Sequence, residues 1–189
     1  MRLVVGVALL HAGLAAADPV VGTRWAVGLA LGGESLTPTA SASTSESVGY
    51  LEAYGRFRVV HNTEIQLALD LGGRSDANLG ALFLDVRYRF NPDDDWRWSL
   101  GGGLGVASVA APTGASDAEK KGRGALRFGG GVERRLGAFA IMAELRLTLI
   151  AKNDFPDPTV PIGPQPAVYY FERNGMSSYG FQVGGSYAW

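Results

Sequence analysis

Hydrophobic residues recur at every second position over most of the chain. The alternation runs through eight segments, which begin near Trp25, Leu51, Ile65, Leu82, Trp96, Leu126, Phe139 and Tyr179. A period of two is typical of β-strands, because successive side chains of a strand point to opposite faces of a sheet. The pattern therefore predicts eight strands, each with one apolar face and one face of small, polar or charged residues.

The connectors between these segments alternate in length. Residues 61–64, 91–95 and 134–137 form short turns, whereas residues 35–46, 72–78, 111–122 and 151–177 form longer loops. Such sorting is typical of outer-membrane barrels, which carry short turns at one end and long loops at the other. A soluble β-sandwich also alternates in hydrophobicity but gives no reason to sort its connectors. The fold class we predict is all-β: an eight-stranded antiparallel up-and-down transmembrane β-barrel.

The first residues have the composition of a secretory signal peptide. Arg2 precedes a short apolar run that ends in Ala15, Ala16 and Ala17. A positive charge, a short apolar core and a small-residue cleavage site are the three parts of such a signal, and an uncleaved anchor is the alternative. We therefore expect a cleavable signal peptide at residues 1–17 and the barrel at residues 18–189. Export would place it in the cell outer membrane of a Gram-negative-type cell.

Aromatic residues cluster at the ends of the segments that the short turns join. Amphipathic rings prefer the interface between membrane and water, so these rings predict a girdle on the periplasmic side. Its proposed members are Trp25, Phe57, Phe90, Trp96, Trp98 and Phe139.

The polar faces of the strands carry many charges, which a barrel would direct into its lumen. The predicted lumen charge network contains Glu52, Arg56, Asp70, Asp85, Arg87, Arg89, Arg97, Arg127, Glu133, Glu144 and Arg146. With Arg58 and Arg74, five acids face eight bases. Eight strands enclose a space that side chains can fill. A ladder of ion pairs that plugs the barrel is favoured, because unpaired buried charges are costly, and a narrow anion-preferring conduit is the alternative.

The C-terminal residues resemble the C-terminal signal of bacterial outer-membrane barrels. Gln182, Gly184, Tyr187 and Trp189 match its polar, glycine and terminal aromatic positions. This resemblance implies recognition by the barrel assembly machinery. The whole pattern is similar to the small eight-stranded outer-membrane β-barrel family, which includes the OmpA membrane domain, OmpX and OmpW. The family implies membrane lipids as partners, and no peptidoglycan-binding domain is expected after Trp189.

Composition argues against several other functions. The chain of 189 residues has a net charge of −1, which gives no basic footprint for nucleic acid, and it lacks cysteine. Glycine runs at residues 101–103 and 129–131 do not form a dinucleotide fingerprint, and they predict a thin barrel wall. Asp93, Asp94 and Asp95 suit a solvated turn. We expect no cofactor and no metal.

These observations predict a structural or minor-pore role without catalysis. Some barrels of this size resemble lipid A deacylases or palmitoyl transferases, which need serine and histidine at the outer rim. His61 is the one histidine after residue 17, and it falls in a predicted periplasmic turn. The alternative role is binding or adhesion through the long loops, or membership of an outer-membrane complex. The proline-rich loop 151–177 could serve as a lid, an adhesin or a spacer for an extracellular or envelope partner.

Overall fold

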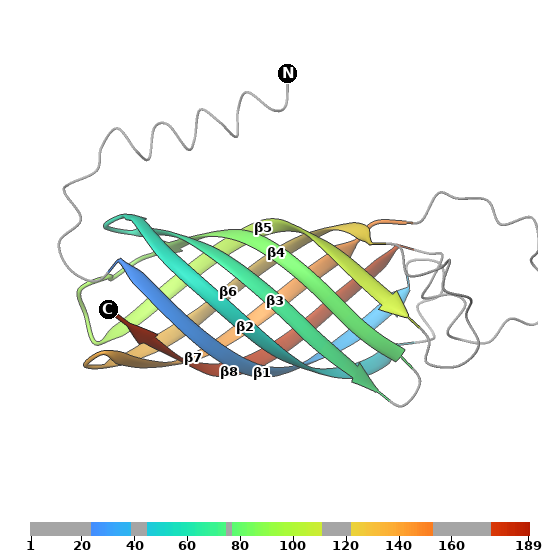
Figure 1. The fold of residues 1–189 in the computed structure, drawn as a ribbon, viewed down its shortest axis with the longest axis horizontal. Helices are drawn as coiled ribbons and strands as arrows, with labels where there is room; N and C mark the ends of the chain where they lie inside the picture. Colours follow the sequence, from blue (N-terminus) through green and yellow to red (C-terminus); the bar gives the residue numbers. More distant parts are fainter. Residues whose placement is uncertain (1–23, 39–44, 75–76, 111–121, 153–174) are drawn as a thin grey trace, which may run out of the picture.

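The alternating segments form eight antiparallel strands that close into a barrel in sequence order (Figure 1). The structure is a computed structural model that describes residues 24–38, 45–74, 77–110, 122–152 and 175–189. The strands are β1 (Trp25–Pro38), β2 (Glu46–Val60), β3 (Thr63–Arg74), β4 (Ala77–Arg89), β5 (Trp96–Ala110), β6 (Arg123–Leu136), β7 (Phe139–Ile150) and β8 (Met176–Ala188). The predicted all-β fold is confirmed, whereas the expected signal peptide lies outside the described residues.

The barrel closes because β8 pairs with β1 over its whole length. The antiparallel register runs from Ala26 opposite Ala188 to Pro38 opposite Met176. Closure leaves no free sheet edge, so every strand can satisfy its backbone groups within the protein. The apolar faces point outward: the side chains of Leu29 and Trp98 are 59% and 58% exposed. The sandwich alternative is therefore wrong, because it would bury these residues between two sheets.

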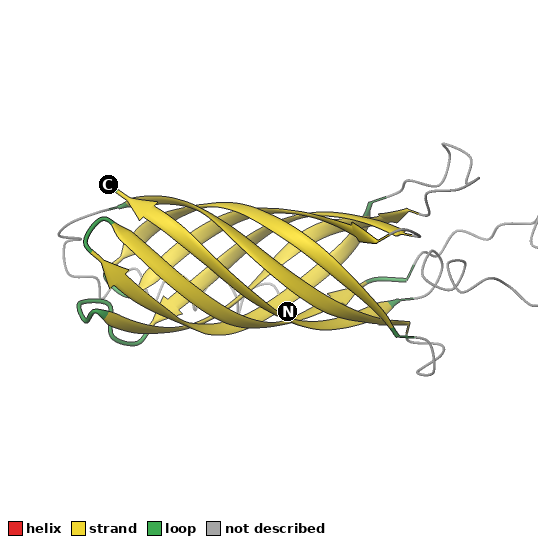
Figure 2. Ribbon diagram, turned by 90° about the horizontal axis from the view of Figure 1, so that it is seen from below, coloured by secondary structure: helices red, strands yellow, loops and turns green. Residues whose placement is uncertain are grey.

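The two ends of the barrel differ in their connectors (Figure 2). The short-turn end carries the connectors 61–62, 90–95 and 137–138, and the opposite end, which we call the loop end, carries the others. Gly137 has a φ of 70°, as the first central position of a two-residue II′ hairpin turn requires. In the connector 90–95, Asn91 Oδ1 accepts a hydrogen bond of 2.9 Å from the backbone N–H of Trp98.

One predicted connector is wrong. Residues 72–78 were expected to form a loop, but β3 continues to Arg74 and β4 begins at Ala77, so only residues 75–76 separate them. In the structure Gly72 lies within the sheet, where an added Cβ would come within 2.8 Å of Tyr50 Cβ. A side chain at position 72 would also come within 2.6 Å of the backbone oxygen of Gly49, so the close approach of β2 accounts for the glycine. The strict alternation of short and long connectors therefore does not hold.

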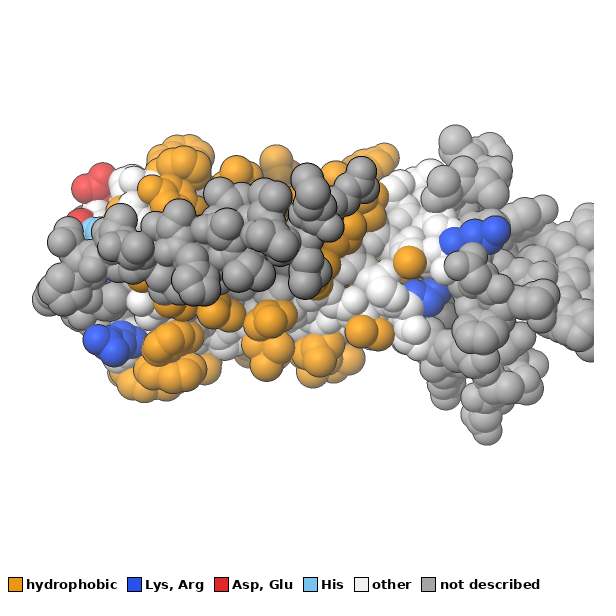
Figure 3. Space-filling view, turned by 90° about the horizontal axis from the view of Figure 1, so that it is seen from above, with side chains coloured by type: hydrophobic (Ala, Val, Ile, Leu, Met, Phe, Trp, Pro, Cys, Tyr) orange, Lys and Arg blue, Asp and Glu red, His pale blue; other side chains and the backbone are white. Residues whose placement is uncertain are grey.

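The polarity of the barrel wall inverts near the loop end. Outward-facing leucines and aromatic rings cover the wall next to the short turns, and small or polar side chains replace them towards the loops (Figure 3). On β1, Leu29 and Leu31 face outward first, followed by Ser35 and Thr37. The inward face changes in the opposite sense, from charged to apolar. In the described part of the chain, no helix is long and apolar enough to cross a membrane.

Candidate functional site

The barrel interior holds a dense set of charged side chains. Among the described residues, seven carboxylates and seven arginines are buried. They include all eleven members of the predicted lumen charge network, none of which is more than 8% exposed. The side chain of Arg74 lies outside the described part. Positive and negative groups are therefore nearly balanced, in contrast to the excess of bases that the sequence indicated.

Sequence reasoning missed two interior carboxylates. Glu34 and Glu64 are 7% and 5% exposed. Both lie beyond the predicted ends of their strands, but they keep the parity of inward residues, Ala30 on β1 and Gln66 on β3. The same alternation, continued a few residues beyond the hydrophobic residues that end each predicted strand, identifies both as inward-facing. In the structure, Glu34 accepts a hydrogen bond of 2.7 Å from Ser178 Oγ.

Arg127 is the centre of the network in the middle of the barrel. Its Nη1 lies 3.1 Å from Glu52 Oε2 and 3.0 Å from Asp70 Oδ2. Its Nε and Nη2 both donate to the carboxylate of Asp85. The guanidinium also lies over the ring of Phe83, 4.1 Å from its centroid. One side chain from β6 thus gathers carboxylates from three strands on the other side of the lumen.

Arg146 and Arg87 complete this central layer. Arg146 pairs with Glu52 and, at 3.1 Å, with Glu144. Arg87 pairs with Glu144 and donates a hydrogen bond of 2.9 Å to Ser99 Oγ. Each guanidinium has at least one carboxylate partner, as burial of a charge requires. The layer ties β2, β4, β5 and β7 together across the lumen.

A second layer of charges lies nearer the short turns. Glu133 pairs with Arg56 at 2.7 Å, Arg89 at 3.2 Å and Arg97 at 3.7 Å. Glu64 pairs with Arg89 at 2.9 Å and is 3.7 Å from Arg58 Nε. Two carboxylates therefore serve four guanidinium groups in this layer.

Gln66 connects the two charged layers. Its side-chain oxygen accepts a hydrogen bond of 2.7 Å from Arg56 Nε and one of 3.4 Å from Arg87 Nη1. Arg56 belongs to the layer near the short turns, and Arg87 belongs to the central layer. A neutral acceptor between two arginines lets them approach one another without a further carboxylate.

Apolar side chains predominate in the lumen at the loop end, beside the buried Glu34, Ser178 and Arg123. They form one buried cluster of Leu36, Val48, Leu79, Ala81, Phe83, Ala107, Ala125, Ile150 and Met176. Leu36, Phe83 and Met176 are each 2% exposed. The alternation in the sequence does not reveal this cluster, because it predicts that the apolar residues of each strand lie on the outer face. Near the loop end the polarity of the two faces is inverted, so apolar residues there face the lumen.

The glycines of β5 and β6 make room for these bulky interior groups. An added Cβ at Gly105 would lie 2.8 Å from Phe83 Cε1, and one at Gly101 would lie 3.0 Å from Arg87 Cγ. On β6, a Cβ at Gly129 would lie 2.6 Å from Glu144 Oε1. The glycine runs thus act as the thin wall that the sequence suggested.

Within the described ranges, no group of three His, Cys, Asp or Glu side chains could hold a metal ion.

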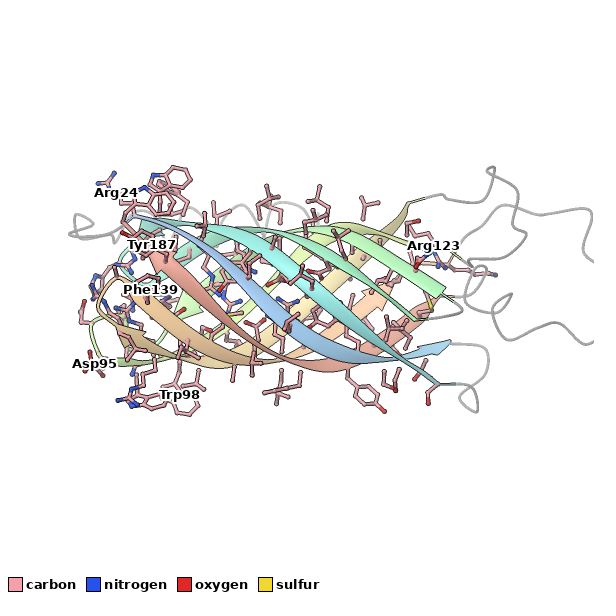
Figure 4. The ribbon with its side chains drawn as sticks, turned by 60° about the horizontal axis from the view of Figure 1, so that its bottom comes forward. Arg24, Asp95, Trp98, Arg123, Phe139 and Tyr187 are labelled. Carbon is pink, nitrogen blue, oxygen red and sulfur yellow. The ribbon has the colours of Figure 1, made fainter. Side chains whose placement is uncertain are left out.

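The aromatic residues of the predicted girdle lie near the strand ends that the short turns join, and Figure 4 labels Trp98 and Phe139 at this end. Trp25 packs on the half-buried Phe57 with 4.5 Å between ring centroids, and Phe139 contacts Tyr187 at 5.0 Å. The other members point outward, with exposed fractions between 52% and 60%: Phe90, Trp96 and Trp98.

The C-terminal residues that match the assembly signal divide between the two faces of β8. Gln182 is fully buried, accepts a hydrogen bond of 3.3 Å from Tyr50 and donates one of 3.5 Å to Glu52. Gly184 also faces inward, where a Cβ would lie 2.6 Å from Ala30 Cβ. Tyr187 and Trp189 face outward with their rings stacked. The signal residues thus also have structural contacts, and recognition by an assembly machinery stays a prediction.

Solved structures share this architecture. No family model matches the chain, and no curated protein does. Neisserial surface protein A is 15% identical, with a TM-score of 0.68 over 89% of this chain and 100% of its own. OprG from Pseudomonas aeruginosa is 10% identical, with a TM-score of 0.52 over 91% and 99%. The outer membrane enzyme PagL is 13% identical, with a TM-score of 0.52 over 84% and 97%. The chain therefore has the fold of small outer-membrane barrels, which confirms the resemblance seen in the sequence.

Proposed function

We propose that the protein is a closed outer-membrane barrel, which acts as a structural element of the envelope and does not pass solutes. The observation that carries this proposal is the filled lumen. Two charged layers and one apolar layer follow one another between the short-turn end and the loop end.

Exposed apolar residues support a lipid environment. Leucines at the middle of the wall are largely exposed, with Leu104 at 67% and Leu145 at 66%. In water such a continuous apolar surface would drive aggregation, whereas in a bilayer it faces hydrocarbon. The aromatic rings at the short-turn end then lie at one membrane interface.

The arrangement of the interior favours a plug over the anion-preferring conduit. An anion that passed beyond the short-turn mouth would meet the central layer, where the donors of Arg127 are already engaged by Glu52, Asp70 and Asp85. Beyond them it would meet the apolar cluster around Phe83 and Met176, which offers no group to replace its hydration shell. Both barriers must be removed before ions can cross.

Gel migration and planar-bilayer recording together test the proposal. A closed barrel migrates differently on a denaturing gel before and after heating, and we expect the folded protein to give no conductance steps. The double variant Arg87→Ala, Arg127→Ala should also stay silent, because the apolar cluster remains. Anion-selective steps in the parent that lose their selectivity in the double variant would instead establish the conduit.

Contact through the loops is a second candidate function. The strands continue beyond the apolar band, where Ser35, Ser47 and Asn78 face outward. This extension would hold the long loops away from the membrane surface, as a binding role needs. Deletion of residues 154–166 tests this loop-contact function. The barrel should still show heat-modifiable migration, while cells that carry the shortened protein should be retained on a protein-coated surface less than cells that carry the parent. If retention does not change, the segment does not bind the surface and acts as a spacer.

We assign no catalytic role to the protein. His61 lies at the short-turn end, where its Nε2 is 2.9 Å from Asp93 Oδ2 and both side chains are exposed. The lipid A chemistry weighed from the sequence needs a base beside a serine at the opposite rim, and His61 is the one histidine after residue 17. Mass spectra of lipid A from cells with and without the protein should be identical, and altered acyl chains would show that this assignment is wrong.

A further inference from the structure

The short-turn end contains an open basin that the closed-barrel function does not use. Its volume is about 150 Å³. Six arginines line it: Arg24, Arg56, Arg58, Arg89, Arg97 and Arg135. The acidic side chains of the lining are Glu64, Asp93 and Glu133. Figure 4 places Arg24 at this end of the barrel and Arg123 at the other.

Positive charge exceeds negative charge in this basin. Glu133 is shared by Arg56, Arg89 and Arg97, and Glu64 is shared by Arg58 and Arg89. Asp93 is largely exposed and pairs with His61. None of these carboxylates is left to neutralise Arg24 or Arg135 on the rim.

The central layer shows that this excess is local. There, the carboxylates Glu52, Asp70, Asp85 and Glu144 outnumber the arginines Arg87, Arg127 and Arg146, which pair with them. The interior charges are nearly balanced as a whole, yet they are separated along the barrel axis. The positive potential is therefore concentrated at the mouth, where a ligand can reach it.

Arg58 supplies a hydrogen-bond donor that has no acceptor. Its Nε is buried and has no hydrogen-bond partner among the described residues, and Glu64 Oε1 lies 3.7 Å away. A buried donor without an acceptor is costly, and a charged donor is more so. Arg58 lines the basin and its side chain as a whole is 12% exposed, so an anion in the basin lies beside this guanidinium.

We propose that this basin binds a phosphate group. Guanidinium groups present N–H donors in a planar fork that matches the oxygens of phosphate, and the rim arginines add charge without a competing carboxylate. A volume of about 150 Å³ suits a compact oxyanion. Trp25 and Phe139 line the same basin and belong to the outward girdle, so the phosphate can belong to a free anion or to the headgroup of a neighbouring phospholipid.

Titration with inorganic phosphate tests the site. The protein is folded in a maltoside detergent, which contains no phosphate, and the side-chain Nε–Hε resonance of Arg58 is followed by NMR. Phosphate should shift it saturably, while chloride at the same ionic strength should not. A linear shift that is equal for both salts means screening alone and overturns the proposal.

Variants at the two ends of the barrel provide the matched comparison. The Trp25 indole resonance serves as a second probe of binding. Arg24→Gln should weaken phosphate binding several-fold and Arg58→Gln about tenfold, because each variant removes the guanidinium N–H donors of one arginine in the basin. Arg123→Gln removes one arginine at the loop end and should leave the affinity unchanged. Heat-modifiable migration shows that each variant is folded. Since Arg24 is exposed at the rim, its variant decides the question if Arg58→Gln does not fold. Equal affinity in folded Arg24→Gln and the parent overturns the proposal.

A second titration identifies the source of the phosphate group. Phosphatidylglycerol is added to the detergent at a fixed phosphate concentration. If the site holds a lipid headgroup, the lipid displaces inorganic phosphate and the Arg58 resonance moves to a new position. If it holds a free anion, the phosphate-bound resonance does not change. Either result is compatible with the site, and the absence of saturation by both ligands excludes it.

Discussion

At the scale of single residues, buried arginines control which carboxylates can be tolerated inside the barrel. Arg127 contacts Glu52, Asp70 and Asp85. It shares Glu52 and Asp70 with Arg146, and among the described contacts no other arginine pairs with Asp85. In a protein interior, the attraction between two paired charges exceeds the free-energy cost of removing both from water by little or nothing. Their contribution is therefore specific: the pairs determine the side-chain arrangement of the lumen more than they raise its stability.

We expect Arg127→Met to lower the free energy of unfolding by about 3–5 kcal/mol, because it strands buried carboxylates without removing them. The matched control is Arg134→Met on the same strand, whose exposed guanidinium lies over Trp96 on the outer surface. It should cost less than about 1 kcal/mol, in keeping with exposed charge contacts. Urea titrations in lipid vesicles, followed by tryptophan fluorescence, measure both. Similar values for the two variants would contradict the central role of Arg127.

At the scale of the elements, pairs of neighbouring strands share the space of the lumen. β5 contributes glycines at the inward positions 101, 103 and 105, while β4 contributes Arg87, Asp85 and Phe83 beside them. Side chains of β4 therefore lean over the bare backbone of β5. A strand rich in glycine is weak by itself, and here the packing of its neighbour against the backbone compensates.

The variant Gly105→Ala tests this arrangement. Its Cβ would come within 2.8 Å of Phe83 Cε1, so we expect overpacking to cost about 1–3 kcal/mol of unfolding free energy. Gly80→Ala is the control, because a Cβ there meets nothing within 4 Å, and it should be neutral or stabilising by up to about 1 kcal/mol. Relative to the parent protein, the denaturant midpoint should fall in Gly105→Ala and should stay the same or rise in Gly80→Ala. If Gly105→Ala is as stable as Gly80→Ala, the ring of Phe83 does not depend on the glycine.

At the scale of the whole molecule, the inversion of polarity sets the position of the barrel in a membrane. Apolar residues face outward next to the short turns and inward at the loop end. The outside of the wall near the loops is polar (Figure 3), and its inside carries the apolar cluster, as in a water-soluble barrel. The hydrocarbon boundary should cross β1 between Leu31 and Ser35.

Two arginine substitutions on the outer face of β1 locate this boundary. Leu29→Arg should destabilise the folded barrel by about 2–4 kcal/mol, as a charge in the hydrocarbon does, and Ser35→Arg should cost about 0–1 kcal/mol. Folding in lipid vesicles measures both free energies. The two sites are six residues apart on the same face of one strand, which keeps the other contributions similar. Equal costs would mean that the apolar band extends as far as Ser35.

The alternation of residues by itself determined the number of strands, their faces and the side on which each predicted charge lies. It could do so because side-chain direction in a strand depends only on parity, as the eleven interior charges illustrate. The alternation did not fix the strand ends: residues 72–78 were expected to form a loop, whereas β3 continues to Arg74 and Gly72 lies close to the backbone of Gly49 on β2.

Only the tertiary structure decided which charges meet and what the lumen contains at each level. Arg127 and Asp70 are 57 positions apart, and they come together through the combined tilt and register of the intervening strands. The apolar cluster at the loop end was hidden for a related reason. Leu36 was expected to lie in the loop 35–46, so the parity of the strand was not extended to it. In the structure β1 continues to Pro38, and Leu36 lies inside while Leu31 lies outside. The concentration of arginines at the short-turn mouth likewise exists only once eight strands share one axis.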